Sequence, residues 1–288
     1  MSNIADILLD SFLDSLKVLG FAFIIFFIFS FFEDKIIRLF NKKSRISPLI
    51  GASLGLIPEC GVSVLASDLY TSRLITTGTI FAVFFASSDE ALPLLISNFD
   101  KAIYALPLLF IKIIFGFLFG FLIDLIYHKN DYKEIKNNDY FRSEDKINNE
   151  HENESFFMSH FMHPFLHSIK IFVYVFIISF LFGLLLYFIG EDNVIKFMSE
   201  NIYLSPLFAS IIGLIPNCSS SILITNVFIK GGIPFAALTS GLSVNSGVGI
   251  LYLFKSKNDI KNKLFILSSL FLTSNLVGYI TLFIMKLF

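Results

Sequence analysis

Residues able to bind an ion occur in two clusters, each inside an otherwise apolar stretch of the sequence. Carboxylate, amide and hydroxyl oxygens suit hard divalent cations such as Mn²⁺, whereas thiolates favour softer ions such as Zn²⁺, Cd²⁺ or trivalent arsenic. Both kinds of ligand are present, which predicts a site for a metal or metalloid ion. The candidate residues are Glu59, Cys60, Asp68, Ser88, Asp89, Glu90, Asn217, Cys218 and Asn245. Direct metal ligation is expected of Asp89, Glu90, Cys60 and Cys218.

The two stretches that carry these residues, 47–98 and 205–254, repeat each other. They align without a gap at an offset of 158 residues, so that GLIPEC, which ends at Cys60, matches GLIPNC, which ends at Cys218. The chain has only these two cysteines, and they hold equivalent positions. This pattern predicts an internal duplication.

The rest of the chain is unusually apolar. Of its 288 residues, 55% are hydrophobic and 16% are charged, whereas a soluble domain has about a quarter charged residues. We therefore expect an all-α, multi-pass membrane protein whose surroundings are a lipid bilayer. A formal net charge of -1 argues against a nucleic-acid-binding surface. Runs close to the roughly 20 apolar residues of a simple transmembrane helix are Leu16–Phe32, Ala105–Tyr127, Ile169–Ile189 and Leu264–Leu287.

Between its simple helices, each half is expected to hold a hairpin and a broken helix. Ser47–Thr71 divides at Pro58–Gly61 into arms of about 11 residues, or about 17 Å of helix, too short to cross about 30 Å of hydrocarbon. A re-entrant hairpin fits this length, giving about ten helical segments in all; ten full crossings are the alternative. Non-helical backbone at bilayer depth must face protein or water. Both hairpin tips and both helix breaks are thus predicted to converge on a cavity.

The distribution of basic residues predicts how the two repeats are oriented. Five basic residues follow the first span, whereas the equivalent loop after Ile169–Ile189 has only Lys196 beside acidic residues. By the positive-inside rule these loops lie on opposite sides, so the repeats are expected to be inverted. The five basic residues are Lys35, Arg38, Lys42, Lys43 and Arg45.

The expected domains are a first membrane repeat at 1–127, a polar cytoplasmic linker at 128–164 and a second membrane repeat at 165–288. The linker is rich in Asn, Lys and Glu, which is typical of a flexible segment. Three histidines at or just after its end could collect metal or form an interfacial patch. They are His160, His163 and His167.

Carboxylates predominate among the charged residues expected inside the membrane. A charged, unpaired carboxylate at mid-depth costs about 2.5–3.5 kcal/mol. A bound cation or protons must compensate, unless the carboxylates stay protonated or bond to helix ends. The only intramembrane base, Lys112, is expected to extend to the membrane interface and not to pair with Asp89. The carboxylates are Glu59, Asp68, Asp89 and Glu90.

The motifs GLIPECGVSVLASDLY and FASSDEALPLL in the first half, with GLIPNCSSSIL and LSVNSGVGIL in the second, resemble those of the bacterial ten-helix heavy-metal exporters. Members of that family are named either arsenic efflux proteins or manganese transporters. The resemblance covers both repeats and implies a multi-pass exporter of a metal or metalloid ion in the bacterial cytoplasmic (inner) membrane.

Oxygen ligands around the SSDE segment favour a hard divalent cation, so proton-coupled manganese export is the first hypothesis. Arsenite or organoarsenical efflux is the second, and a metal-ion channel lined by the hairpins is a third. An enzyme is not expected, because the sequence has no HExxH, no GxxxxGK and no nucleophilic serine on a GxSxG elbow. No cofactor is expected.

Overall fold

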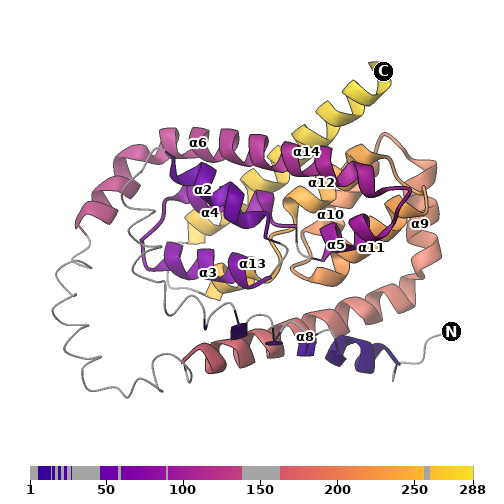
Figure 1. The fold of residues 1–288 in the computed structure, drawn as a ribbon, viewed down its shortest axis with the longest axis horizontal. Coiled ribbons are helices and arrows are strands. Elements are labelled where there is room, and N and C mark those ends of the chain that lie inside the picture. Colours follow the sequence, from indigo (N-terminus) through magenta and orange to yellow (C-terminus); the bar gives the residue numbers. More distant parts are fainter. Residues whose placement is uncertain are drawn as a thin grey trace.

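The computed structural model describes residues 6–13, 15–16, 19–20, 23–24, 27, 46–57, 60–88, 90–137, 163–255 and 260–287. Every regular element among them is a helix, which confirms the predicted all-α class (Figure 1). In the first half the helices are α2 Ser47–Gly55, α3 Cys60–Thr71, α4 Thr77–Ala86, α5 Ala91–Ser97, the 3-10 helix η1 Ala102–Tyr104 and α6 Ala105–Asn137. In the second they are α8 His163–Ile189, α9 Glu191–Glu200, α10 Ser205–Gly213, α11 Cys218–Ile229, α12 Phe235–Val244, α13 Gly249–Lys255 and α14 Ile260–Leu287.

The sequence duplication is matched helix by helix. Adding 158 to the bounds of α2, α3, α4 and α5 gives the bounds of α10, α11, α12 and α13 at both ends of each helix. Each half therefore contains the expected short-armed hairpin, followed by a helix that is interrupted and then continues. The inverted relation of the halves stays a prediction.

Local sequence accounts for where these short helices begin and end. Pro48 and Pro206 occupy the first turn of α2 and α10, where a missing backbone N–H costs nothing. The Thr76 hydroxyl caps α4 by accepting a hydrogen bond from the backbone N–H of Thr79 at 3.2 Å. Ser87 and Asn245 adopt extended ψ angles of 133° and 103°, which end α4 and α12 at equivalent positions.

The two halves are interleaved. Within each half the first hairpin arm packs on the broken helix and on the long helix, giving the triplets α2, α4, α6 and α10, α12, α14. The second arms cross over, because α3 packs on α13 and α11 packs on α5. Figure 1 shows the α3–α13 pair to the left of the α5–α11 pair.

Glycine permits a close approach of the first hairpin arm to the broken helix in each half. A Cβ added to Gly55 would lie 2.4 Å from the Val83 carbonyl oxygen, and one added to Gly213 would lie 2.2 Å from the Gly241 carbonyl oxygen. Both pairs are equivalent under the 158-residue offset, so the two repeats share this backbone contact.

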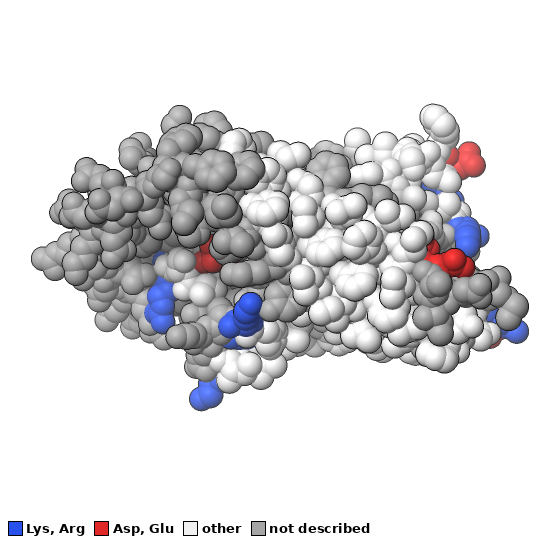
Figure 2. Space-filling view, turned by 90° about the horizontal axis from the view of Figure 1, so that it is seen from below, with Lys and Arg blue, Asp and Glu red and all other residues white. Residues whose placement is uncertain are grey.

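Four helical segments among the described residues are long and apolar enough to span a bilayer. Two of them confirm the predicted spans Ala105–Tyr127 and Leu264–Leu287, and the other two are the broken helices at 77–97 and 235–255. Figure 2 shows a broad surface without charged side chains between two ends where the charges gather. The chain is thus a multi-pass membrane protein.

The remaining predicted segments are only partly described. The span Ile169–Ile189 lies within the 27-residue helix α8. Leu16–Phe32 lies mostly outside the described residues, although the described residues between 6 and 27 are helical. Helix α6 continues through Asn137, so it extends into the segment expected to be a linker. Residues 138–162, including His160, lie outside the described part of the chain, as do the side chains of the other two histidines.

Replacing Gly55 or Gly213 by alanine tests the shared contact. Each added methyl group would collide with a backbone carbonyl, and such overpacking costs about 1–3 kcal/mol. We expect both variants to unfold at lower temperature than the wild type in detergent. Gly20→Ala is the matched control, because no heavy atom lies within 4 Å of its added Cβ. An unchanged midpoint for Gly55→Ala and Gly213→Ala would contradict the packing described above.

Candidate functional site

The first-half candidates fall largely outside the described residues. Glu59 and Asp89 are both in undescribed positions, and only the backbone of Cys60 is described, at the start of α3. Glu90 precedes α5 as its N-cap residue and is partly exposed. Ser88 is 2% exposed, and its hydroxyl donates to the Ala86 carbonyl oxygen at 3.1 Å. Ligation of a metal by the carboxylates therefore stays a prediction.

The described part of the chain contains no group of three or more His, Cys, Asp or Glu residues able to hold a metal ion. Asp68 is exposed, eight residues or about 12 Å along α3 from its first residue. Asp68 thus lies at the surface of the described structure and about two helical turns from the start of α3.

The second hairpin tip and the second helix break do converge, as predicted from the sequence. The Asn245 side-chain amide donates to the Ser220 hydroxyl at 3.2 Å and to the Asn217 carbonyl oxygen at 3.4 Å. Its side-chain oxygen accepts from the backbone N–H of Gly247 at 2.8 Å. Asn217, Ser220 and Asn245 are all nearly fully buried. These contacts fix the backbone where α12 is interrupted to the N-terminus of α11.

Helix α8 closes this cluster from a third side. The Ser179 hydroxyl donates to the Asn217 side-chain oxygen at 3.0 Å, while the Asn217 side-chain nitrogen has no hydrogen-bond partner. The buried side chain of Cys218 lies next to it in the sequence. Amide, hydroxyl and thiol groups, but no described carboxylate, therefore line the second tip.

The two helix breaks meet at Lys112 on α6. This side chain is 0% exposed, and its ammonium donates to the carbonyl oxygen of Ser87 at the end of α4 and to that of Leu242 near the end of α12, the latter at 2.8 Å. The prediction that Lys112 reaches the membrane interface is wrong. Terminal helix carbonyls lack intrahelical partners and carry partial negative charge, so the interior supplies the acceptors that a buried ammonium needs.

Asp124, also on α6, is a buried acid that the sequence reasoning missed. Its carboxylate accepts hydrogen bonds from the Thr76 hydroxyl and from the backbone N–H of Gly78, each at 2.7 Å. It is 7% exposed and sits at the N-terminus of α4. An acid inside the predicted span Ala105–Tyr127 was the available signal. Helix α6 thus places a negative charge at the start of α4 and a positive charge at its end, matching the helix dipole at both ends.

A serine at GxSxG spacing does occur, at Ser53 in the segment GASLG, but it is not on an elbow. It lies inside helix α2 and its hydroxyl donates to the Leu49 carbonyl oxygen at 2.9 Å. A nucleophile elbow needs a sharp turn between strand and helix. This helix therefore offers no hydrolase geometry.

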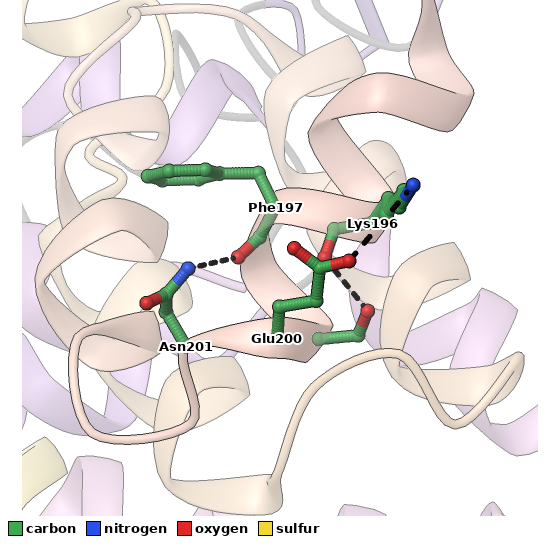
Figure 3. Close-up of polar contacts among 5 residues, drawn as sticks. Lys196, Phe197, Glu200 and Asn201 are labelled. Carbon is green, nitrogen blue, oxygen red and sulfur yellow. Dashed lines mark hydrogen bonds and ion pairs between the residues drawn. The ribbon is translucent and has the colours of Figure 1, made fainter.

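The surface helix α9 is polar and lies away from these contacts. Figure 3 shows the exposed pair Lys196 and Glu200, with nitrogen and oxygen 4.0 Å apart, and the Asn201 amide donating to the Phe197 carbonyl oxygen at 3.0 Å. Exposed ion pairs of this kind contribute about 0–1 kcal/mol. Asn201 offers a matched control for buried asparagines.

Comparison with known proteins identified one family. The family model described as "Putative, 10TM heavy-metal exporter" matches residues 1–171 and 142–254. No curated protein and no solved structure matched the chain.

Asn245→Ala tests the second-half cluster. The change leaves the Ser220 hydroxyl and the Gly247 N–H without this partner, and buried groups left unpaired cost about 1–3 kcal/mol. We expect a clear fall in the thermal unfolding midpoint in detergent. Asn201→Ala, which removes one exposed side-chain hydrogen bond, is expected to change it little. Equal effects of the two substitutions would show that Asn245 does not hold the break in place.

Proposed function

Because the chain belongs to the 10TM heavy-metal exporter family, we propose that it is a secondary transporter that moves a divalent metal ion, most readily Mn²⁺, out of the bacterial cytoplasm across the inner membrane. One observation supports a site at the helix breaks. The ends of α4 and α12 approach each other in the interior, and the segment SSDE follows α4 directly. Asp89 lies between the buried Ser88 and the partly exposed Glu90 in that segment.

The arrangement of the halves is compatible with alternating access. In transporters built from inverted repeats, substrates bind near mid-membrane at discontinuous helices, and one part rocks against the other. Here the second hairpin arm of each half packs on the continued helix of the other half, as α3 on α13 and α11 on α5. We propose that the repeats are inverted and that these crossed pairs flank the transport route.

The donor set favours manganese over arsenic. Asn217 and Asn245 offer amide oxygens, and Asp89 and Glu90 add carboxylates, all of which suit a hard cation. The second candidate, efflux of arsenite or an organoarsenical, is favoured by the buried thiol of Cys218 and by its equivalent Cys60. A channel is the third candidate.

Proton coupling is the proposed energy source. The sequence has no nucleotide-binding GxxxxGK loop. Two neighbouring carboxylates such as Asp89 and Glu90 are not expected to be both charged in a membrane interior without a cation, so we expect binding of a metal ion to displace protons.

Asp89→Asn should abolish manganese tolerance in a bacterial strain that lacks other manganese exporters. Removing a residue that only hydrogen-bonds a metal ligand lowers metal affinity by roughly 10- to 100-fold. We expect loss of the charge of a ligand itself to weaken Mn²⁺ binding by at least that much. Tolerance is measured as growth against manganese concentration, with intracellular metal measured by mass spectrometry. The panel includes other divalent metals, arsenite and an organoarsenical.

Two further variants sharpen this test. Asp100→Asn, in the exposed turn after α5, is the matched control and should keep full tolerance. Cys60→Ser combined with Cys218→Ser should also keep manganese tolerance. If the double cysteine variant loses tolerance while Asp89→Asn keeps it, the hard-cation assignment is wrong and the arsenic candidate takes its place.

A flux assay separates an antiporter from a channel. In vesicles with purified protein, inward Mn²⁺ movement by an antiporter should shift the lumenal pH in proportion to metal moved, and should persist when the membrane voltage is clamped to zero. A channel would follow the metal gradient and the voltage without a proportional pH change. Lumenal pH is read with an entrapped dye, alongside metal uptake.

A further inference from the structure

We propose that the Lys112 ammonium is a tethered monovalent cation, occupying a cation site that the carbonyl ends of α4 and α12 form between the two repeats. The inference concerns the same region as the proposed transport site and deepens it, although its first observation is independent of transport. Two of the ammonium's hydrogen bonds go to backbone carbonyls, one from each repeat.

The geometry is that of a cation site shared by two helix ends. Ser87 is the C-cap residue of α4, and Leu242 is the third residue from the end of α12. Both carbonyl groups therefore belong to the last ones of their helices, which have no N–H donor within the helix. In transporters with discontinuous helices, such unwound carbonyls and helix C-termini coordinate Na⁺ or a proton. Here a side chain from a third helix, α6, fills the position.

The charges balance in magnitude. A helix C-terminus carries about half a negative elementary charge, so two of them offset about one positive charge. Both α4 and α12 have 10 residues, long enough for this effect. A fully buried ammonium without such compensation would be costly in this interior. The partial negative charges of the two helix ends therefore favour a positive charge at the position of the Lys112 ammonium.

Only one of the two repeats supplies the cation. The residue equivalent to Lys112 under the 158-residue offset is Leu270 on α14, which is 0% exposed and lies in the apolar core. Two ammonium groups, one from each repeat, would be directed to the same pair of helix ends and would repel each other. The duplication thus keeps two equivalent helix ends but one cation.

Two consequences follow for transport, and these rest on the proposed function. The carbonyl ends are already filled, so the transporter should need neither Na⁺ nor K⁺ as a bound partner. The metal ion must then find its ligands beyond the helix ends, among the side chains of the segment after α4. Lys112 is in this sense a positioning residue, because its ammonium holds the end of α4 and the end of α12 in place relative to each other.

Lys112→Ala should turn the filled site into an empty one that takes a free cation. The purified variant is expected to unfold at lower temperature than the wild type when N-methylglucamine, too large for the site, is the only monovalent cation. Methylammonium, ammonium, Na⁺ or K⁺ should then raise the midpoint saturably, by about 5 °C at a concentration of about 100 times the dissociation constant. Wild-type protein should show no such rise.

Lys263→Ala is the matched control. Lys263 is also a buried lysine, 3% exposed, whose ammonium donates to a carbonyl near a helix end, that of Phe254 at 3.0 Å. This bond goes to the end of α13 and not to the ends of α4 and α12, so removing Lys263 should destabilise the protein without creating a cation-dependent rise. A merely structural role for Lys112 predicts that both variants behave as Lys263→Ala does.

Each outcome decides the proposal. A folded Lys112→Ala whose midpoint does not respond to any small cation overturns it, and so does an equal response from Lys263→Ala or from the wild type. If Lys112→Ala is not recovered folded in N-methylglucamine, membranes are solubilised with methylammonium instead. Recovery of monodisperse protein only with the amine supports the site, and no recovery with it overturns the site. Because unfolding is measured without transport, failure of the manganese hypothesis leaves this result intact.

Discussion

Satisfying backbone carbonyls inside a membrane is the constraint on which this fold depends. Interrupting a helix at bilayer depth exposes its last carbonyl groups where lipid offers no hydrogen-bond donor. The chain interrupts two equivalent helices, after Ala86 and after Val244, and must supply donors at both places. One ammonium, that of Lys112, donates to carbonyls at both ends. The helix interruptions, which create room for an ion site, therefore go together with the buried ammonium that supplies donors to their carbonyls.

The same reasoning explains the spacing of charges along α6. Lys112 and Asp124 are twelve residues apart, about 18 Å along the helix axis, and α4 has 10 residues, or about 15 Å. An antiparallel neighbour of this length can place an acid at the N-terminus of α4 and a base at its C-terminus. Gly78 and Gly120 allow the approach, since a Cβ added to Gly78 would lie 2.0 Å from the Gly120 carbonyl oxygen. Charge placement and small-residue packing thus support the same contact.

The sequence predicted the repeated elements well because their signals are local. Proline in the first turn, extended backbone at the break and the constant 158-residue offset mark α2–α5 and α10–α13 without tertiary information. Convergence of Asn245 with the second tip followed from the duplication. The role of Lys112 could not be predicted, because distance along α6 says nothing about which helix ends pack against it. Asp124 was missed for a similar reason: its partners, Thr76 and the Gly78 N–H, come from another helix.

Equivalent helices in the two halves are held by different forces, and this asymmetry has a mechanical consequence. Separating α4 from α6 would leave Asp124 and Lys112 without the partners that offset a cost of about 2.5–3.5 kcal/mol for each buried charge. In the corresponding contact of α12 with α14, Ser240 lies against Gly278. Leu270 and Leu282 hold the positions equivalent to Lys112 and Asp124. Neither leucine carries a charge that sliding of α12 along α14 would uncover. A rearrangement that keeps Asp124 and Lys112 with these partners must therefore move α4 with α6, whereas no equivalent pair of charges ties α12 to α14.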